Sequence, residues 1–420
     1  MNPFSSLHKW CVGLGRVFAN ELKLITHDAA ILLFFVALPL AYPVVYTLIY
    51  NPEVVREIPV AVVDDSRTPA SRDLVMTASA TPAMQIYAYC ANMAEAKELM
   101  AEGKVFGILQ IPHDYGKNLV AGIPAHASFY SDMSLLLRYR AFVAALTDIQ
   151  IEIIQEVTGE KIASTGLSSL AGGASAPINS ESNFLGDTEQ GFASFVIPGI
   201  VILILQQSMV LGVSTLGGTS RERRRRNGGI DPLEPQGVPV SAQIWGKALA
   251  VTVFYIPFTV YVLRFIPEMF NLPHYGSALD YLPFVFPLLL GSAFMGQASV
   301  ILMKERESPF IFIVFTSVFF LFLSGLTWPR YAMSELWTWV GNCVPATWGV
   351  EGFIRINSNA ASLADVSREY TALWVLAAAY MVLAYAVTRY IETSARRTAA
   401  RAANNANQST STSSTADGRN

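Results

Sequence analysis

Long uninterrupted apolar runs constrain this chain more than any other feature of its sequence. A helix of about 20 apolar residues is long enough to cross roughly 30 Å of hydrocarbon. Such runs occupy residues 29–50, 192–216, 245–266, 281–303, 309–327 and 371–391. We therefore expect an α-helical membrane protein with six transmembrane helices, the first at 29–50 and the other five within 192–391.

The fifth run is short, and a charged cluster separates it from the fourth. The cluster consists of Lys304, Glu305, Arg306, Glu307 and Ser308. Because charged side chains are costly in lipid, we expect the fourth and fifth helices to form a tight hairpin with the cluster outside the membrane. Pro309 fits the first turn of the fifth helix, where its missing N–H costs nothing.

The composition agrees with a membrane protein. Hydrophobic residues make up 52% of the 420 residues and charged residues 15%, whereas soluble domains carry about 25% charged residues. A net charge of −3 implies no polyanionic partner such as a nucleic acid. The cysteines Cys11, Cys90 and Cys343 are far apart, which suggests neither a zinc site nor a disulfide framework. The first apolar run begins near Ala29 and contains no Ala-x-Ala site, so we expect a retained anchor.

Basic residues lie unevenly between the two sets of loops. One set carries Lys9, Arg16, Lys23, Arg221, Arg223, Arg224, Arg225, Arg226, Lys304, Arg306, Arg396, Arg397 and Arg401. The short loops of the other set hold no Lys or Arg in 267–280 and only Arg330, Arg355 and Arg368 in 328–370. By the positive-inside rule, both termini of this multi-pass chain are expected in the cytoplasm.

The two ends of the chain differ from the spans. Residues 1–28 place apolar side chains at helical spacing, which favours a helix lying in the cytoplasmic interface of the membrane. The alternative is an amphipathic helix packed on protein. The end of the chain is rich in Asn, Ser, Thr and Ala without periodicity, so we expect a disordered cytoplasmic tail over 392–420.

Residues 51–191 are expected to form a mixed α/β extracytoplasmic domain inserted after the first span. Short β-branched runs predict strands at 58–65, 105–111 and 127–130. Helical patterns cover 92–102 and 134–157, and Asn92 is a candidate N-cap with Glu95 three residues later. The Ser-, Gly- and Ala-rich stretch 160–188 predicts a flexible connection.

Signatures of catalysis are missing from the sequence. It contains no Gly-x-x-x-x-Gly-Lys-Ser/Thr loop, no HExxH pair and no Gly-x-Ser-x-Gly elbow. The five histidines are scattered. We therefore expect no enzymatic activity, no metal site and no cofactor in this chain.

The centres of the predicted spans hold polar but neutral side chains. These are Gln206, Gln207, Ser208, Ser292, Gln297 and Ser299. Hydrogen bonds between helices would explain them, and a polar lining of a translocation path would explain Gln206, Gln207 and Gln297 as well. A proton-coupled carrier is expected to show a carboxylate inside the membrane, which these spans lack.

The 217–243 loop is strongly basic. It contains six consecutive residues, Arg221, Glu222, Arg223, Arg224, Arg225 and Arg226. The number of arginines among them exceeds what membrane orientation needs. An anionic lipid surface or an acidic partner would use the surplus. The position of the run between two spans excludes a nucleic-acid site.

Four further stretches are informative when they are taken together. They are the strand at 58–65, the segment 103–112 with Gly103, Gly107 and Pro112, the loop from Arg221 to Lys247, and the segment 322–352 with Pro329, Pro345 and Trp348. In this order and spacing they resemble the permease subunit of ABC type-2 transporters, in the branch with a large periplasmic domain between the first two spans. In one place the chain departs from the family, since four arginines and then Asn-Gly-Gly follow Glu222.

The resemblance implies the membrane half of a multidrug-efflux-like pump. Such permeases form homo- or heterodimers and bind separate ATPase subunits that use ATP-Mg. It implies ATPase-coupling surfaces at 221–226 and at Lys304, Glu305, Arg306 and Glu307. It also implies export of drugs or other amphipaths, with a periplasmic adaptor and an outer-membrane channel as further partners.

Tryptophans and prolines gather at 328–358, after the fifth span. An aromatic belt at the membrane surface is one interpretation. The other is a re-entrant pair of helices that caps the exit path, with Trp348, Glu351 and Arg355 as its residues and with Glu351 paired to Arg355 one turn away. For the chain as a whole, the alternative to a pump is a non-transporting scaffold or receptor that presents the 51–191 domain to an external partner.

Overall fold

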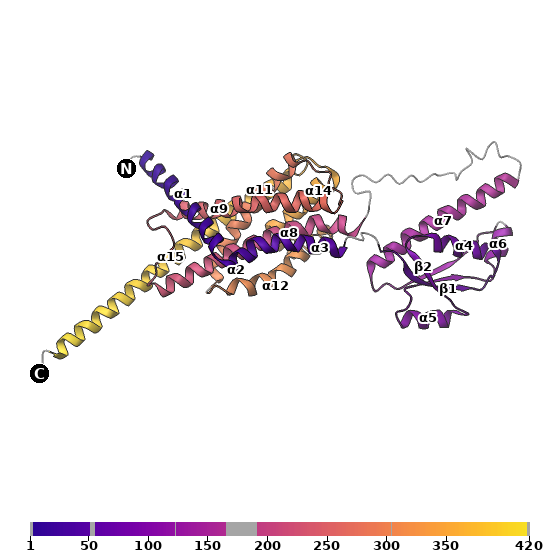
Figure 1. Ribbon diagram of the computed structural model, residues 1–420, viewed down its shortest axis with the longest axis horizontal. Coiled ribbons are helices and arrows are strands. Elements are labelled where there is room, and N and C mark those ends of the chain that lie inside the picture. The colour runs from indigo at the N-terminus through magenta and orange to yellow at the C-terminus, as the bar shows by residue number, and fades with distance from the viewer. Residues whose placement is uncertain (1–2, 51–54, 122, 165–190, 304, 418–420) are drawn as a thin grey trace. The chain divides into compact units, whose positions relative to one another are not determined.

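The computed structural model describes residues 3–50, 55–121, 123–164, 191–303 and 305–417. The chain divides into two compact units, Met1–Asn51 with Phe184–Asn420, and Pro52–Asn183. We call the first unit the helical bundle, because its regular secondary structure in the described part is helical (Figure 1). We call the second unit the inserted domain, and it contains a sheet.

Within the described residues, five helical segments of the bundle are long and apolar enough to cross a membrane. They are Ala29–Tyr50, Phe192–Arg226, Val240–Met269, Ala278–Leu302 and Ser367–Arg397. Each corresponds to one predicted span. The predicted fifth span is the shorter helix α12 (Ser308–Leu323) of 16 residues, so a sixth crossing stays a prediction.

Some of these segments contain more than one helical element. The first joins α2 (Ala29–Leu32), the π-helical turn η1 (Leu33–Ala37) and α3 (Leu38–Tyr50). The third joins α9 (Val240–Val260), the π-helical turn η3 (Tyr261–Phe265) and α10 (Ile266–Met269). The others are α8 (Phe192–Arg226), α11 (Ala278–Ser299) with the 3-10 turn η4 (Val300–Leu302), and α15 (Ser367–Asp417).

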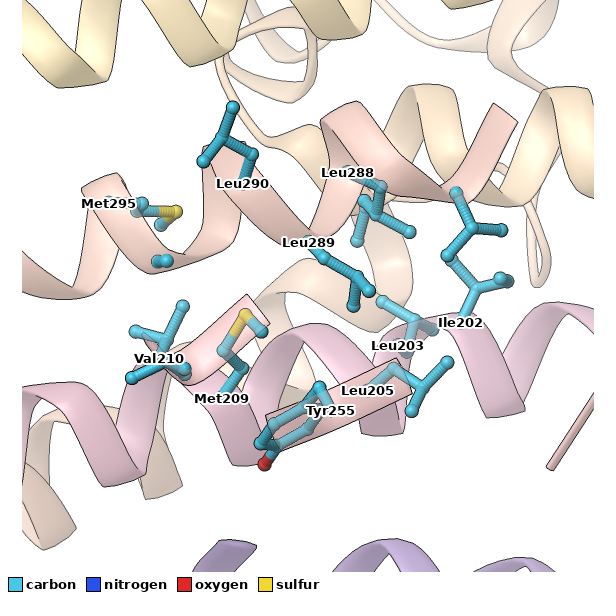
Figure 2. Close-up of a cluster of buried hydrophobic side chains, with 14 of the residues drawn as sticks. Ile202, Leu203, Leu205, Met209, Val210, Tyr255, Leu288, Leu289, Leu290 and Met295 are labelled. Atoms are coloured by element: carbon cyan, nitrogen blue, oxygen red, sulfur yellow. The ribbon is translucent and has the colours of Figure 1, made fainter. Parts of the chain in front are cut away.

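Helices α8 and α11 form the centre of the bundle. Their most apolar stretches are 83% buried, against 22% for α15. Helix α8 packs against α3, α11, α12 and α14. Figure 2 shows Leu289 of α11 pointing toward Leu203 of α8, within a cluster that also includes Tyr255 of α9. Close side-chain packing of this kind is what holds helices together in lipid.

Helix α1 (Pro3–His27) precedes the first span and is separated from it by a capping residue. The Asp28 side chain accepts hydrogen bonds from the backbone N–H groups at the start of α2, which ends one helix and begins the next. One stripe of α1, formed by Val17, Glu21 and Ile25, is buried, and α1 packs along α9. Leu7 is 59% exposed. One side of α1 is therefore packed on protein, as the alternative interpretation of an amphipathic helix expects. A position of α1 in the membrane interface stays a prediction.

After α12 the chain forms η5 (Arg330–Ala332), α13 (Glu335–Asn342) and α14 (Pro345–Asn359). A Cβ added to Gly199 of α8 would meet Leu326 and Val350, so this segment folds back against the first half of α8. Its two short helices match the predicted pair near 328–358, while their depth in a membrane stays a prediction. We call this end of the bundle the tryptophan end, because Trp328, Trp337, Trp339 and Trp348 lie in the segment.

The tail differs from its prediction. Helix α15 continues to Asp417, where the sequence predicts disorder over 392–420. The segment from Ala399 to Ala406 is rich in alanine, the residue with the highest helix propensity, which explains why the helix continues.

In the described part of the inserted domain, four strands form one sheet in the order β2-β1-β3-β4. The strands are β1 (Ile58–Asp64), β2 (Met84–Tyr89), β3 (Gly107–Ile111) and β4 (Ser128–Ser131). Strand β1 is parallel to β2 and β3, and β4 is antiparallel to β3. Since β1 is central and both its faces are covered, Val60 and Val62 join one core cluster and Ala61 and Val63 the other.

Helices cover both faces of this sheet (Figure 1). Helices α4 (Pro69–Ala80), α6 (Tyr115–Ala121) and α7 (Leu136–Ser164) lie on one face, and α5 (Met93–Ala101) lies on the other. The predicted strands and helices of the domain are present, including the Asn92 cap, whose side chain accepts from Glu95 N at 3.0 Å. Helices α4 and α6 and strand β2 were not predicted from the sequence. The predicted connection 160–188 lies outside the described residues from 165 onward.

Candidate functional site

Helix α8 ends in a run of arginines, and the loop that follows supplies their carboxylate partners. Arg223 donates two parallel hydrogen bonds to Asp231, with Nε–Oδ1 and Nη2–Oδ2 distances of 2.9 Å each. Arg224 pairs with Glu234, which also accepts from Lys247 Nζ of α9 at 2.6 Å. The Asp231 and Glu234 side chains are 0% and 10% exposed. The loop is therefore fastened to the helices by ion pairs that are largely shielded from solvent. We call this end of the bundle, around residues 221–226, the arginine end.

The carboxyl group of Glu234 is the centre of this network. Burial alone would raise its pKa, but the charges of Lys247 and Arg224, together with their hydrogen bonds, hold the pKa well below the ordinary value for glutamate. The arginines also lie at the end of α8 where the helix dipole is negative, which favours positive side chains.

These pairs divide the arginines of the predicted ATPase-coupling surface into two groups, and coupling itself stays a prediction. Arg223 and Arg224 are turned toward the protein because Asp231 and Glu234 come back to meet them. Arg226 pairs with Glu222 one turn away at 2.5 Å, but its side chain is 76% exposed. Arg225, the remaining member of the run, is exposed as well.

Two apolar side chains of the same loop face outward. Ile230 is 59% exposed and Leu233 is 49% exposed. They lie on either side of Asp231 and Pro232, and Leu233 immediately precedes Glu234. The ion pairs of Asp231 and Glu234 therefore fix the position of the backbone that carries these two side chains. The sequence analysis did not select them. The sequence feature that could have identified them is the presence of two large aliphatic residues in an otherwise polar stretch.

Arg221 joins α8 to the end of α11. Its Nη1 donates to the main-chain carbonyl oxygens of Val300, Ile301 and Met303 at 2.7, 3.0 and 2.8 Å. The last carbonyls of a helix lack partners within the helix, and here a side chain supplies the donors.

The turn between α11 and α12 contains the second predicted coupling surface. Arg306 pairs with Asp28, the cap of the first span, at 2.5 Å. The main-chain oxygen of Glu305 lies against Gly218 of α8. No ion pair involves Glu305 or Glu307 within the described residues, and Lys304 lies outside them. The arginine end thus connects α8, α9, α11 and the start of the first span.

Several polar residues of the spans form hydrogen bonds between helices, as the first interpretation predicted. Tyr255 of α9 donates to Ser208 of α8 at 3.1 Å. The hydroxyls of Ser214 and Ser299 are 2.7 Å apart. Gln297 of α11 donates to the carbonyl of Ile244 at 3.2 Å. Ser292 bonds within its own helix, to Leu288 O at 2.6 Å.

Gln206 and Gln207 are different. Gln206 is fully buried and its Nε2 reaches only the sulfur of Met295, at 3.8 Å. Its Oε1 and both polar atoms of the Gln207 amide are buried, and no described residue forms a hydrogen bond with them. A buried amide left unpaired costs about 1–3 kcal/mol, so these two residues call for a role other than stabilising the fold.

At the tryptophan end, the predicted pair of Glu351 with Arg355 does not form. Glu351 pairs with Arg330 from the preceding loop, and the guanidinium of Arg330 lies over the Trp348 ring with its carbon 4.6 Å from the ring centre. Arg355 donates instead to Glu369 of α15 at 3.3 Å. The prediction was wrong because another element brings each residue a closer partner than its neighbour on the same helix.

The comparison with known families agrees with this architecture. A family model described as "ABC-2 family transporter protein" matches residues 29–386, which is most of the chain and includes the arginine end and the tryptophan end. The chain belongs to the ABC-2 transporter family. No protein of curated function matches it.

Family membership makes this ABC-2 permease a transport subunit of the membrane, of a kind that in general works with an ABC ATPase. Among the described residues, no group of three or more His, Cys, Asp or Glu side chains could hold a metal ion.

The ABC-2 permease also has a small cavity at its arginine end. The cavity has a volume of about 60 Å³, enough for a few water molecules. Glu21 of α1 and Lys247 line it. Glu21 is 4% exposed, and burial raises its pKa although the charge of Lys247 opposes the shift.

Proposed function

We propose that this ABC-2 permease is the membrane subunit of an ATP-driven exporter in a bacterial inner membrane. Two permease copies, or one copy and a paralogue, would form the translocation path. Separate ABC ATPase subunits would bind ATP-Mg and drive it. The observation that supports this most is the loop after α8, which lies between two candidate spans and is held to two helices, α8 and α9, by ion pairs and hydrogen bonds.

The proposal assigns different roles to different residues of the arginine end. Ile230, Leu233, Arg225 and Arg226 are exposed, so they are the residues that we propose to contact the ATPase. Arg223 and Arg224 would hold the loop rigid rather than touch the partner. Because the loop is fastened to α8 and α9, a push on Ile230 or Leu233 would reach these helices directly.

The turn at residues 304–307 is the second proposed coupling element. Arg306 ties it to the start of the first span and Arg221 ties the end of α11 to α8. A force applied at the turn would therefore reach the helices that the loop does not hold.

We also propose that α12 crosses the membrane as the sixth span. Its first turn follows Arg306 at the arginine end, and the chain after its last turn reaches Glu351 at the tryptophan end. Its 16 residues extend about 24 Å. Local thinning of the bilayer accommodates a mismatch of this size. Six spans would place both termini in the cytoplasm and the inserted domain outside.

For the path itself we propose Gln206 and Gln207. Their unpaired amides would hydrogen-bond to a passing substrate or to the facing permease copy. Gln297 is less suited to this role because its amide already bonds to α9. Trp348, Glu351 and Arg355 stay the proposed cap of the exit. A periplasmic adaptor and an outer-membrane channel rest on the family resemblance alone, as do amphipaths as the exported class.

The test of coupling is co-purification of the full chain with its ABC ATPase, followed by ATP-driven uptake of a fluorescent amphipath into inside-out vesicles. Ile230→Ser with Leu233→Ser should weaken ATPase binding at least tenfold, while Ile230→Val with Leu233→Met should keep it. Arg396→Ser with Arg397→Ser, which removes two exposed charges elsewhere on the chain, serves as the control. Wild-type chain that neither binds an ABC ATPase nor transports any of the tested amphipaths would overturn the proposal.

Topology is tested by labelling cysteines introduced one at a time in a Cys11→Ser, Cys343→Ser background, which keeps only the buried Cys90. Arg225→Cys should react only with reagent added from the cytoplasmic side, and Tyr331→Cys, at a position that is 93% exposed, only from outside. Reaction of both cysteines from the same side would contradict a crossing by α12. In that case the scaffold or receptor alternative, which needs no ATPase contact at all, would become the better explanation.

A further inference from the structure

The tryptophan end contains an open cavity of about 500 Å³. This lies within the range of small-molecule sites, roughly 300–1,000 Å³. The residues just after α12, the loop with η5, helices α13 and α14 and the start of α15 form its walls. The lining residues that carry the argument are Arg330, Tyr331, Glu351, Ile354, Arg355 and Arg368.

Positive charge predominates on these walls. Three of the lining residues are arginines, against the single carboxylate of Glu351. Arg330 is already paired with Glu351 and also donates to Asn342. Arg355 donates to Glu369, whose side chain is 3% exposed, and to the carbonyl oxygen of Asp365 at 3.0 Å. These two arginines are held in place by their own partners.

Arg368 is the exception. It is exposed, and its guanidinium carbon lies 5.5 Å from the centre of the Trp348 ring. Within the part of the chain that the structure describes, no carboxylate pairs with it. Stacking on an aromatic ring orients a guanidinium while leaving its N–H groups available. A planar fork of donors of this kind binds the two oxygens of a carboxylate or phosphate group.

Apolar surface lies beside these charges. Tyr331 and Ile354 line the cavity. Helix α12 ends just before the lining residues Ser324 and Gly325 and exposes Val318 and Phe322 at 57% each. A ligand with a charged head and a hydrocarbon tail could therefore place its head near Arg368 and its tail along α12.

We propose that this cavity binds the oxyanion head group, a phosphate monoester or a carboxylate, of an amphipath. Arg368 is the residue that recognises it, and Arg355 adds positive potential. The binding itself does not depend on the proposed function. The further step, that acidic amphipaths are the exported class and leave through this cavity, rests on it.

The experiment measures binding to the purified full chain in a non-ionic maltoside detergent, without any ATPase. By calorimetry, dodecyl phosphate should bind at one saturable site per chain, while dodecanol and inorganic phosphate should bind at least tenfold more weakly. Arg368→Gln should weaken dodecyl phosphate binding about ten- to a hundredfold, since charge-assisted hydrogen bonds are lost. Arg264→Gln is the matched control, because Arg264 is exposed, pairs with Glu268 and does not line the cavity.

The role of Arg355 is tested with Arg355→Lys, which keeps the charge beside the buried Glu369 and should reduce affinity less than Arg368→Gln does. Equal affinity of wild type and Arg368→Gln, or equal binding of dodecanol and dodecyl phosphate, would overturn the proposal.

The source of the natural ligand is a separate arm. Phospholipid that co-purifies with wild type, is displaced by dodecyl phosphate and is absent from Arg368→Gln would support the site as a membrane-lipid site. Dodecyl phosphate binding with no such lipid would support it as a site for a transported compound. Because none of these measurements uses ATP, a failure of the exporter proposal leaves them unaffected.

Discussion

At the scale of single residues, two glutamines of the candidate spans differ in the hydrogen bonds of their side-chain amides and lead to opposite predictions. The Gln207 amide is buried without partners, whereas the Gln297 amide donates to Ile244 O. Gln207→Leu should therefore raise the free energy of unfolding by about 1 kcal/mol or more, and Gln297→Leu should lower it by about 1 kcal/mol. Thermal unfolding of the purified chain measures both. If Gln207 lines the path, Gln207→Leu should also lose transport while gaining stability, and equal effects of the two variants would contradict the assignment.

Glu234 gives a second residue-scale prediction. Glu234→Gln leaves Lys247 and Arg224 without an anionic partner in a largely shielded site. Since Lys247 retains some exposure, at 23% of its side chain, we expect a loss of about 3 kcal/mol, the lower end for breaking a buried pair. Glu222→Gln is the control, because its partner Arg226 is 76% exposed and the loss should stay below about 1 kcal/mol.

The pH dependence of the same variant follows from the sign of the shift. The pKa of Glu234 is lower in the folded chain, so its contribution is present above the ordinary glutamate pKa of about 4.3 and is lost as the pH falls below it. The difference in unfolding midpoint between wild type and Glu234→Gln should shrink below about pH 4. A difference that stays constant on acidification would show that the ion pairs contribute nothing.

Glu21 shifts in the opposite direction. Burial raises its pKa; Glu234 and Asp231 act in the same sense, and Lys247 and Arg223 act against it. The carboxyl group of Glu21 therefore binds its proton more tightly in the folded chain than in the unfolded chain. The resulting contribution to the free energy of unfolding is complete below about pH 4.3 and is lost as the pH rises. Relative to wild type, Glu21→Gln should gain stability as the pH rises above the ordinary glutamate pKa of about 4.3. Parallel melting curves over that range would contradict the shift.

At the scale of elements, close contacts fix where α8 meets its neighbours. A Cβ on Gly218 would lie 2.8 Å from the main-chain oxygen of Glu305, which cannot rotate away, whereas a Cβ on Gly291 would meet nothing closer than 3.6 Å. Gly218→Ala should thus destabilise the bundle by about 1–3 kcal/mol. Gly291→Ala should be neutral or stabilise it by up to about 1 kcal/mol, through helix propensity. Comparing their melting temperatures tests the contact, and equal values would refute it.

The elements also show what the sequence could and could not predict. Long apolar runs set the spans, because a span needs only length and hydrophobicity. The capped helix at Asn92 and the buried strand β1 were visible for similar local reasons. Strand β2 was missed although Met84, Ile86 and Ala88 alternate with exposed side chains, because its six residues give a weak signal. Helix α4 was missed although Thr68 and Pro69 are good first residues for a helix.

The candidate site was less accessible to prediction. Its arginines could be found from the sequence, but their partners could not. Arg223 meets Asp231 and Arg224 meets Glu234 only because the loop folds back. In the same way, Glu351 pairs with Arg330 and not with Arg355, because η5 places Arg330 beside Trp348 and Glu351 of α14. Pairings that depend on the path of a loop cannot be predicted from the local spacing of residues along the sequence.

At the scale of the whole molecule, the inserted domain is a compact unit with core clusters of its own. We expect residues 55–164, expressed alone, to fold and to unfold cooperatively in urea. Phe142 is fully buried and contacts the ring of Phe129, so Phe142→Ala should cost about 3–5 kcal/mol. Val143→Ala, at a position of the same helix that is 44% exposed, should change little. A domain that is unfolded on its own would show that it depends on the bundle.

The pairing of Arg223 and Arg224 has a consequence for the order of events during biosynthesis. Membrane orientation responds to lysines and arginines and hardly to acidic residues, so while a nascent chain enters the bilayer the whole basic run can act as a retention signal. Once the loop closes, Asp231 and Glu234 neutralise half of the four consecutive arginines. The same side chains would then serve two successive stages, first setting the direction of insertion and later locking the finished structure.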